Sequence, residues 1–393
     1  MNMKPKVKTS EIELIDGTIA IIKDTKKYKA LKSENYNFFF NKSDGFFCRW
    51  GKGDYSTKKK TITKQELELF SLWSIIWKEK FNLNEFVNDL DTDGSLDVTS
   101  VEILDWEISE KCDFGCAFCY KSNVSKGKNT SFESFKETFH KLSPSIITIA
   151  YGIGSIHLCP DLWKILDYTR ANGIIPTITI NGDATEEDLE KLSKVVGACA
   201  VSVYDKEKSY NCIKSLTDKG LEQVNIHAII TEEHYLSTMN ILNDIKTDPR
   251  LSKLRALVML SLKEKGRSVG KYHKLSQEKY DTLMKFAIEN DIGFGFDSCS
   301  SAKTYNFVNK NPEYNYIKTY IEPCESSIYS SYLNVSSEYF PCSFSEGTDG
   351  WETGLTIKDD FMKDIWFNQK TQDFRKKVKN CRNCNIACPI YDI

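Results

Sequence analysis

The sequence predicts an α/β protein built on an open, partial (β/α)6 barrel that occupies residues 101–292. Two observations predict this fold. Strand-like and helix-like patterns alternate along the whole stretch, as in a parallel sheet with helices packed on its faces. The strand candidates are short, apolar and partly β-branched, which is typical of buried parallel strands. A β-rich region, residues 1–100, precedes the barrel, and a cysteine-rich α+β extension, residues 293–393, follows it.

The alternation gives an expected position for each element of the barrel. The expected strands are Ile103–Ser109, Ile146–Tyr151, Ile175–Ile180, Ala198–Val203, Gln223–Ile230 and Leu254–Leu262. The expected helices are Phe132–Leu142, Leu162–Ala171, Glu186–Val195, Lys206–Lys219 and Ser237–Ile245. Connections between parallel strands are right-handed, and barrels of this kind hold their sites at the carboxyl ends of the strands.

The first hundred residues show a different pattern. Alternating runs at Thr18–Ile22 and Tyr36–Phe40 predict short strands joined by Asp-Gly turns. An amphipathic helix is expected after them, because Thr63 and Glu66 have the spacing of a capping box. Its apolar stripe, expected to dock on the rest of the protein, consists of Leu67, Phe70, Trp73, Trp77 and Phe81.

Composition excludes several classes of function. The chain is 40% hydrophobic and 27% charged, with a net charge of −2, so nothing in it indicates general nucleic-acid binding. No stretch has the length and apolar character of a membrane span. Thirteen cysteines without a secretory signal favour a cytoplasmic location and metal binding over disulfides.

Three cysteines stand at CxxxCxxC spacing directly after the first expected strand: Cys112, Cys116 and Cys119. A loop this short offers three sulfurs to one iron–sulfur cube and leaves one iron for an outside ligand. Structural zinc is disfavoured, because it usually takes four ligands in two spaced pairs. Burial as apolar residues is disfavoured by Asp113 and Gly115, which are typical of a loop.

This spacing, with Phe118 just before the third cysteine, resembles the motif of the radical S-adenosylmethionine (SAM) enzymes. The resemblance implies a [4Fe–4S] cluster whose open iron chelates the amino and carboxylate groups of SAM. In that family an electron from the cluster cleaves SAM to a 5′-deoxyadenosyl radical, which removes hydrogen from a substrate. The resemblance covers roughly residues 102 to 393 and implies a reductase partner such as flavodoxin or ferredoxin.

The ends of the expected strands supply candidates for SAM binding. Where the family usually carries Gly-Gly-Glu, this chain has Gly152, Gly154 and then Ser155 in place of the acid. A simple turn is the alternative at that segment and also at Asn181-Gly182. With the aromatic residue of the cysteine motif, the expected SAM-binding residues are Phe118, Gly152, Gly154, Ser155, Thr179, Asn181, Ser202 and Arg267. Ser202 and Tyr204, at the end of the fourth expected strand, are weaker candidates than the others, and a surface position is the alternative for Arg267.

The cysteines near the C-terminal end resemble the SPASM/twitch extension of radical SAM enzymes. Cys324 and Cys342 flank an expected hairpin in which Ser337 takes the usual glycine position. Because too few cysteines remain for two four-thiolate cubes, one auxiliary [4Fe–4S] cluster is expected, with structural zinc as the alternative. The metal-ligand candidates of the extension are Cys324, Cys342, Cys381, Cys384 and Cys388. Cys324, Cys342, Cys384 and Cys388 are the preferred four, with Cys381 and Cys299 as competitors.

The remaining thiols and histidines receive structural interpretations. Cys48, Cys199 and Cys212 lie in apolar patterns and are expected in the core, and Cys159 is expected to be partly buried in a loop. His227 is expected to be a core histidine on the fifth strand. Enzymes with such an extension often modify peptides or small proteins, by oxidation, cross-linking or epimerisation. A small molecule or nucleotide is the rival substrate, and a non-catalytic metal scaffold or redox sensor is the rival class.

Overall fold

The computed structural model describes residues 7–51, 62–80, 82–90, 100–348, 350–384 and 388–391, without the side chains of residues 85, 88, 89 and 382–384. Its centre is one ten-stranded sheet in the order β12-β11-β10-β9-β8-β7-β6-β13-β14-β15. All neighbours from β12 to β13 pair in parallel. The parallel strands are β6 (Ile103–Glu107), β7 (Thr148–Gly152), β8 (Ile175–Ile180), β9 (Ala198–Ser202), β10 (Val224–Ile230), β11 (Ala256–Ser261), β12 (Phe294–Phe296) and β13 (Ser330–Leu333).

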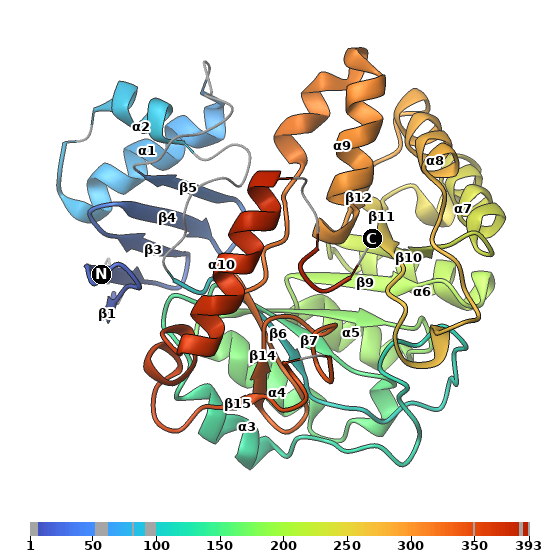
Figure 1. Cartoon of the computed structure of the whole chain (residues 1–393), viewed down its shortest axis with the longest axis horizontal. Coiled ribbons are helices and arrows are strands. Elements are labelled where there is room, and N and C mark those ends of the chain that lie inside the picture. Colours follow the sequence, from blue (N-terminus) through green and yellow to red (C-terminus); the bar gives the residue numbers. More distant parts are fainter. Residues whose placement is uncertain are drawn as a thin grey trace.

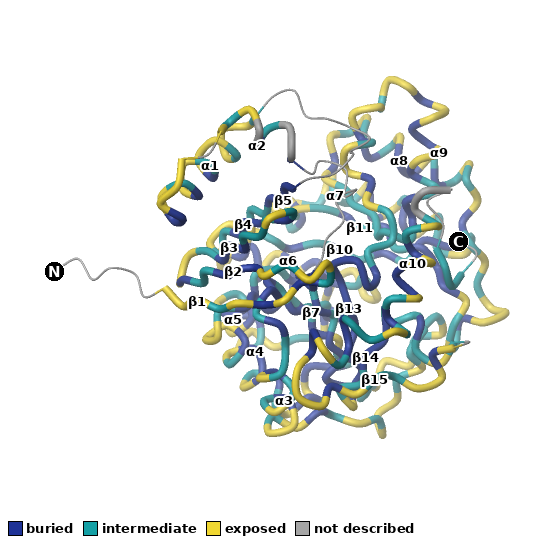
Figure 2. Tube along the Cα trace, turned by 60° about the vertical axis from the view of Figure 1, so that its left-hand side comes forward, coloured by how far each residue is buried: buried dark blue, intermediate teal, exposed yellow. Residues whose placement is uncertain are grey.

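Helices connect the strands of this sheet and cover it. They are α3 (Phe132–Phe139), α4 (Leu162–Ala171), α5 (Glu186–Val195), α6 (Lys206–Asp218), α7 (Tyr235–Thr247), α8 (Gln277–Glu289) and α9 (Ser301–Lys310). The six expected strands and five expected helices are confirmed within a few residues at their ends. Figure 2 shows the strands as buried and the outer faces of the helices as exposed, which is the two-layer arrangement that the alternating pattern predicts.

The sheet extends beyond the expected six strands at both of its edges. β12 adds a seventh parallel strand beside β11, and β13 lies parallel to β6 at the other edge. The strand order is therefore linear between the two edges. The expected domain boundary between residues 292 and 293 remains a prediction, and the sheet runs across it.

The N-terminal region forms a separate antiparallel sheet in the order β1-β2-β3-β4-β5. Its strands are β1 (Lys8–Glu13), β2 (Ile19–Asp24), β3 (Tyr28–Lys32), β4 (Tyr36–Asn41) and β5 (Phe47–Gly51), followed by α1 (Lys64–Trp77) and α2 (Leu83–Asp89). The capping box of Thr63 and Glu66 is present. Trp73 and Trp77 of the expected stripe are buried against this sheet, whereas Leu67 is exposed and Leu69 takes a buried position instead. Phe81 lies outside the described residues.

The N-terminal sheet docks at the amino ends of the parallel strands. Arg49 on β5 forms a buried ion pair with Glu102, which directly precedes β6. The ammonium of Lys29 on β3 donates to the carbonyl of Ile146, just before β7, at 2.6 Å. In Figure 1 this sheet, in blue, lies beside the parallel sheet. The carboxyl ends of the strands therefore remain free of it.

The C-terminal part closes the other side of the molecule. β13 and β14 (Glu338–Phe340) form the expected antiparallel hairpin, β15 (Leu355–Thr356) pairs with β14, and α10 (Gln369–Cys384) follows. Ser337 adopts a φ of 60°, the left-handed conformation that glycine supplies in the family pattern. Figure 1 shows α10, in red, crossing in front of the molecule. Within the described ranges, no helix is long and apolar enough to cross a bilayer.

Candidate functional site

The loop with Cys112, Cys116 and Cys119 lies at the carboxyl end of β6, where the sequence predicts it. Its two ends are tied together, because the amide of Cys112 donates to the carbonyl of Val124 at 3.1 Å. Inside the loop the amide of Cys119 donates to the carbonyl of Cys116 at 3.2 Å. Gly115 has a φ of 63°, which permits the tight turn between the first two cysteines.

Arg267 fixes this loop from the far side of the barrel mouth. Its Nε donates to the carbonyl of Cys116 at 2.8 Å and its Nη1 to that of Asn123 at 2.9 Å. Its backbone amide donates to the carbonyl of Cys119 at 3.0 Å. Arg267 is also an expected SAM-binding residue; the structure shows its contacts with the cysteine loop, and its role towards SAM stays a prediction. Its Nη2 is buried and has no partner among the described residues, so one donor is available to another group.

Two glycines let neighbouring backbone approach the cysteine loop closely. A Cβ placed on Gly154 would lie 2.4 Å from both the Cβ of Cys112 and the carbonyl oxygen of Lys111. A Cβ on Gly266 would lie 2.4 Å from the carbonyl oxygen of Tyr120. Such distances exclude any side chain without movement of the loop. Gly154 and Gly266 therefore determine how the segments after β7 and β11 support the three cysteines.

The three thiols of the loop lie near one another and act on each other electrostatically. Burial raises the pKa of Cys116, and the charges of Cys112 and Cys119 raise it further, while a hydrogen bond with Tyr204 lowers it. A bound cation would remove this repulsion, because metal-bound thiols are deprotonated.

Ser155 lies where the family usually carries an acid, and its hydroxyl donates to a carboxylate from the cysteine loop. The distance from Ser155 Oγ to Asp113 Oδ1 is 2.6 Å, and His157 Nε2 lies 2.9 Å from Asp113 Oδ2. The hydrogen bond from Ser155 is the main cause that lowers the pKa of Asp113. A carboxylate is therefore present beside Ser155, although it comes from a different segment of the chain.

The other expected SAM-binding residues lie at the ends of consecutive strands. Gly152 ends β7, Thr179 lies near the end of β8 and Ser202 ends β9. Asn181 follows β8, and its Nδ2 lies 3.4 Å from the carbonyl oxygen of Gly154. β7, β8 and β9 are neighbours in the sheet, and these positions lie at the carboxyl ends of the three strands. The structure therefore brings Gly152, Thr179, Asn181 and Ser202 to the same end of the sheet.

Thr179 and Ser202 each contact a further polar side chain. Thr179 Oγ1 lies 3.4 Å from Nδ1 of His227, and burial lowers the pKa of His227 to about 4. His227 is therefore neutral near pH 7. Ser202 forms a hydrogen bond with Tyr204, whose pKa burial raises above its ordinary value.

Aromatic side chains surround Phe118 at the barrel mouth. Phe118 stacks on Tyr204 with 5.9 Å between ring centroids and contacts His234 edge-on at 5.1 Å. Tyr272 also contacts it edge-on and stacks on His234 at 5.2 Å. Sequence analysis did not identify His234 and Tyr272, because no motif connects them to the cysteines. The sequence offered one signal for them: His234 follows β10 and Tyr272 follows β11, so both lie beyond the carboxyl ends of strands in the sheet.

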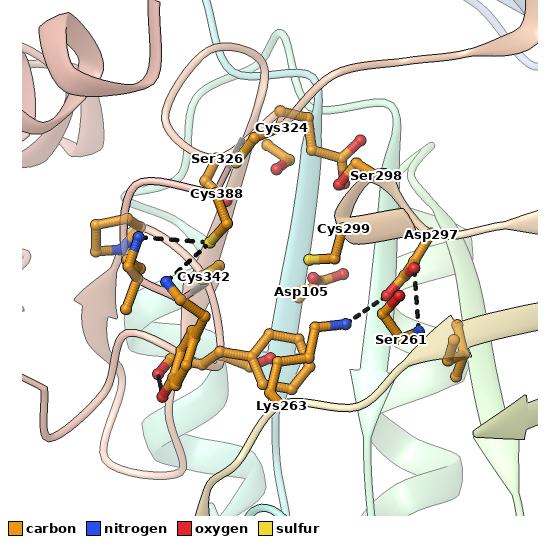
Figure 3. Close-up of a pocket in the computed structure, with 18 of the residues that line it drawn as sticks. Asp105, Ser261, Lys263, Asp297, Ser298, Cys299, Cys324, Ser326, Cys342 and Cys388 are labelled. Carbon is orange, nitrogen blue, oxygen red and sulfur yellow. Dashed lines mark hydrogen bonds and ion pairs between the residues drawn. The ribbon is translucent and has the colours of Figure 1, made fainter. Parts of the chain in front are cut away.

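A cavity of about 420 Å³ lies between the cysteine loop and the C-terminal extension. Phe118 and Tyr120 line it from the loop, and Asp105 of β6 lines its floor. Burial raises the pKa of Asp105 to about 6. Figure 3 shows the thiol groups and Lys263 gathered around this cavity. The cysteines that line it are Cys299, Cys324, Cys342 and Cys388.

The cysteine candidates of the extension divide into three groups. Cys324, Cys342 and Cys388, three of the four preferred metal ligands, line the cavity, and so does Cys299, which was expected only as a competitor. Cys381 is absent from the described lining of the cavity. The side chain of Cys384 lies outside the described residues. Among the described residues, no three side chains of the His, Cys, Asp or Glu type lie close enough together to hold a single metal ion. A cube differs from a single ion in this respect, because its cysteine ligands bind separate irons.

The remaining cysteines agree with their structural interpretations. Cys48, Cys159, Cys199 and Cys212 are all buried. Burial raises the pKa of Cys159 and of Cys212 to about 12. These two thiols are therefore neutral at physiological pH, as expected for unreactive cysteines.

Comparison with known proteins supports this fold. The crystal structure of Streptococcus suis SuiB bound to its precursor peptide SuiA matches with a TM-score of 0.61 and 13% identity, covering 93% of this chain and 95% of that chain. SuiB bound to S-adenosylmethionine matches with a TM-score of 0.57 and 14% identity, over 90% of this chain and 92% of that one. A further SuiB structure matches at 0.59 and 13% identity, with the same coverage. At these identities the likeness shows a shared fold.

Comparisons of sequence add no relative. No protein-family model matches the chain, and no curated protein matches it significantly. The evidence for function therefore rests on the residues at the carboxyl ends of the strands and on the fold shared with SuiB.

Proposed function

We propose that this protein is a radical SAM enzyme that modifies a peptide or small protein. The observation that carries the proposal is the CxxxCxxC loop, held at the barrel mouth by Arg267 and Gly154. The fold shared with SuiB, whose structures hold S-adenosylmethionine and a precursor peptide, supports it. When bound, a [4Fe–4S] cluster and SAM supply a 5′-deoxyadenosyl radical that removes hydrogen from an unactivated C–H bond.

The residues of this chain bind and orient the reactants in this proposal. Cys112, Cys116 and Cys119 hold the cluster, and the ends of β7, β8 and β9 face SAM. Asp113 takes the place of the missing acid: its carboxylate, fixed by Ser155 and His157, accepts hydrogen bonds from the SAM amino group. The aromatic group around Phe118 excludes water from the adenosine side of the site.

The role of Asp113 has its own test. Asp113→Asn keeps the size of the side chain but removes the charge that favours an ammonium group. We expect the KM for SAM to rise about tenfold with little change in iron content, which corresponds to about 1.4 kcal/mol. Glu110→Gln, a nearby half-buried carboxylate that is not part of the proposed SAM site, is the matched control. An unchanged KM in Asp113→Asn would remove Asp113 from the site.

The substrate is the finer part of the proposal. The peptide class is supported by the fold shared with SuiB, one of whose structures holds a precursor peptide. The enzyme, reduced under anaerobic conditions with SAM, should change the mass of a short precursor peptide encoded beside its gene, or exchange a hydrogen with deuterated solvent. Cleavage of SAM without any change in such a peptide would point to a small-molecule or nucleotide substrate.

A further inference from the structure

We infer that Cys299 is the fourth thiolate of a second iron–sulfur site, in a set with Cys324, Cys342 and Cys388, and that Lys263 donates to its sulfur. The inference rests on the proposed iron–sulfur chemistry and deepens it. It assigns a ligand from the segment after β12, Cys299, which was expected only as a competitor. It also places the second site between the barrel and the extension.

The four cysteines come from four separate segments and meet at one cavity. Cys299 lies in the single 3₁₀ turn Ser298–Ser300 after β12. Cys324 precedes β13, Cys342 follows β14, and Cys388 follows α10. All four line the cavity, as Figure 3 shows for their labelled side chains. The thiol of Cys299 interacts electrostatically with those of Cys324 and Cys342, and Cys342 in turn with Cys388.

Hydrogen-bond donors point at the sulfurs of Cys324, Cys342 and Cys388. The amides of Ile390 and Tyr391 each donate to Cys388 Sγ at 3.4 Å. Backbone groups of Phe344 and Ser345 form hydrogen bonds with Cys342, and Ser326 donates to Cys324. Hydrogen bonds to sulfur stabilise thiolates and are a regular part of the surroundings of iron–sulfur clusters.

Cys299 receives its donor from a buried lysine instead. Lys263 follows β11, forms a hydrogen bond with the Cys299 thiol and an ion pair with Asp297, and is 5% exposed. Its ammonium also lies 4.5 Å from the ring centroid of Phe344. A buried ammonium is costly unless negative groups surround it. A thiolate at Cys299, formed when a cluster binds, would supply a second negative partner beside Asp297.

The pairing of β11 with β12 explains why Cys299 lies beside Lys263. β12 pairs in parallel with β11 at Met259 and Phe296, so the segments that follow these two strands leave the sheet side by side. Lys263 and Cys299 lie in those segments. Four cysteine ligands would fill every vertex of a cube, so no iron would remain for a substrate atom.

The test counts iron in a chain without the first site. Cys112→Ala, Cys116→Ala and Cys119→Ala are combined in the full-length protein, which is reconstituted anaerobically. We expect about four irons per chain. Adding Cys299→Ala should remove at least one iron and give the electron paramagnetic resonance signal of a three-iron cluster. Adding Cys384→Ala, or Cys212→Ala in the core as a matched control, should change neither reading.

Several outcomes would overturn the inference. These are four irons and an unchanged spectrum in the Cys299→Ala chain, loss of iron in the Cys384→Ala chain, or zinc instead of iron in the triple variant. Because the first site is absent from this chain, none of these results depends on SAM cleavage, which tests the proposed function separately.

Lys263→Met provides a second test, in which all four cysteine ligands are kept. Removing a positive charge beside the cluster should shift its midpoint potential to a more negative value while the iron content stays the same. An unchanged potential would show that Lys263 does not donate to the cluster.

Discussion

The two cysteine sites of this protein are built in opposite ways. The first takes all three cysteines from one loop, residues 112–119, after a single strand. The second draws its four from segments that lie far apart in the sequence, between residues 299 and 388. In our proposal the first site keeps one vacant iron, and the second is closed by four thiolates. The difference teaches that a local motif can specify an open site, whereas a closed site here needs the whole fold.

The largest expected effect separates the chemistry of the two sites. Cys116→Ala should reduce SAM cleavage to the level of a protein-free control, because in our proposal it removes a ligand of the cluster that binds SAM. Cys324→Ala should lose iron from the second site yet still release 5′-deoxyadenosine. Chromatography of the nucleoside with iron analysis measures both. Equal loss of SAM cleavage in both variants would contradict the division of roles.

The second effect concerns how the first site is supported. Arg267→Ala removes two side-chain hydrogen bonds to carbonyls of the cysteine loop. We expect the free energy of unfolding to fall by about 2 to 3 kcal/mol and the loop to incorporate less iron. Arg250→Ala, which breaks ion pairs with Glu207 and Asp248 at the surface, is the control and should cost less than about 1 kcal/mol. Equal losses in the two variants would argue against the positioning role of Arg267.

The third effect is a dependence of stability on pH that arises inside the barrel, beside the first site. Burial lowers the pKa of His227 to about 4 from its ordinary 6.5. Between pH 6.5 and pH 4 the imidazole of His227 is protonated in the unfolded chain but stays neutral in the folded chain. The contribution to stability is therefore complete above that pH and is lost as the pH falls towards 4.

The measurement compares the wild type with His227→Gln by denaturant unfolding. Between about pH 8 and about pH 4, the wild type should lose up to about 3 kcal/mol more stability than the variant. Parallel curves for the two proteins would mean that His227 is protonated as easily in the folded state as in the unfolded state.

The smallest effect lies in the hairpin between two cysteines of the second site. Ser337 has a φ of 60°, which costs a residue with a side chain about 1 kcal/mol relative to glycine. Ser337→Gly should raise the free energy of unfolding by up to that amount without changing the iron content. Ser336→Gly, one residue earlier, should not stabilise the protein. A destabilised Ser337→Gly variant would indicate that the serine side chain is needed in the turn.

The same contrast explains how much could be predicted from the sequence. The barrel strands, their helices and the first cysteine loop depend on short-range patterns, such as the apolar run of β10 and the spacing of Cys112 and Cys116, and these predictions are confirmed in position. β12 and Cys299 were assigned to the extension, because a three-residue strand carries too little pattern to place it in a sheet. The carboxylate beside Ser155 was also missed, because Asp113 comes from another segment.

The N-terminal region shows a related limit. Its strands and the capped helix were predictable, but its place at the amino ends of the barrel strands was not. That place depends on single long-range contacts, such as Arg49 with Glu102 and Lys29 with the carbonyl of Ile146. A region docked there is remote from the cysteine loop, so substrate contacts are expected from the extension and the barrel mouth instead.

The central claim is that the loop of residues 112–119 presents a vacant iron vertex to SAM. The most direct measurement is the release of 5′-deoxyadenosine when the anaerobically reconstituted wild-type protein is reduced with dithionite in the presence of SAM. We expect the nucleoside to form and to disappear in Cys116→Ala. A wild-type protein with full iron content that leaves SAM intact would contradict the claim.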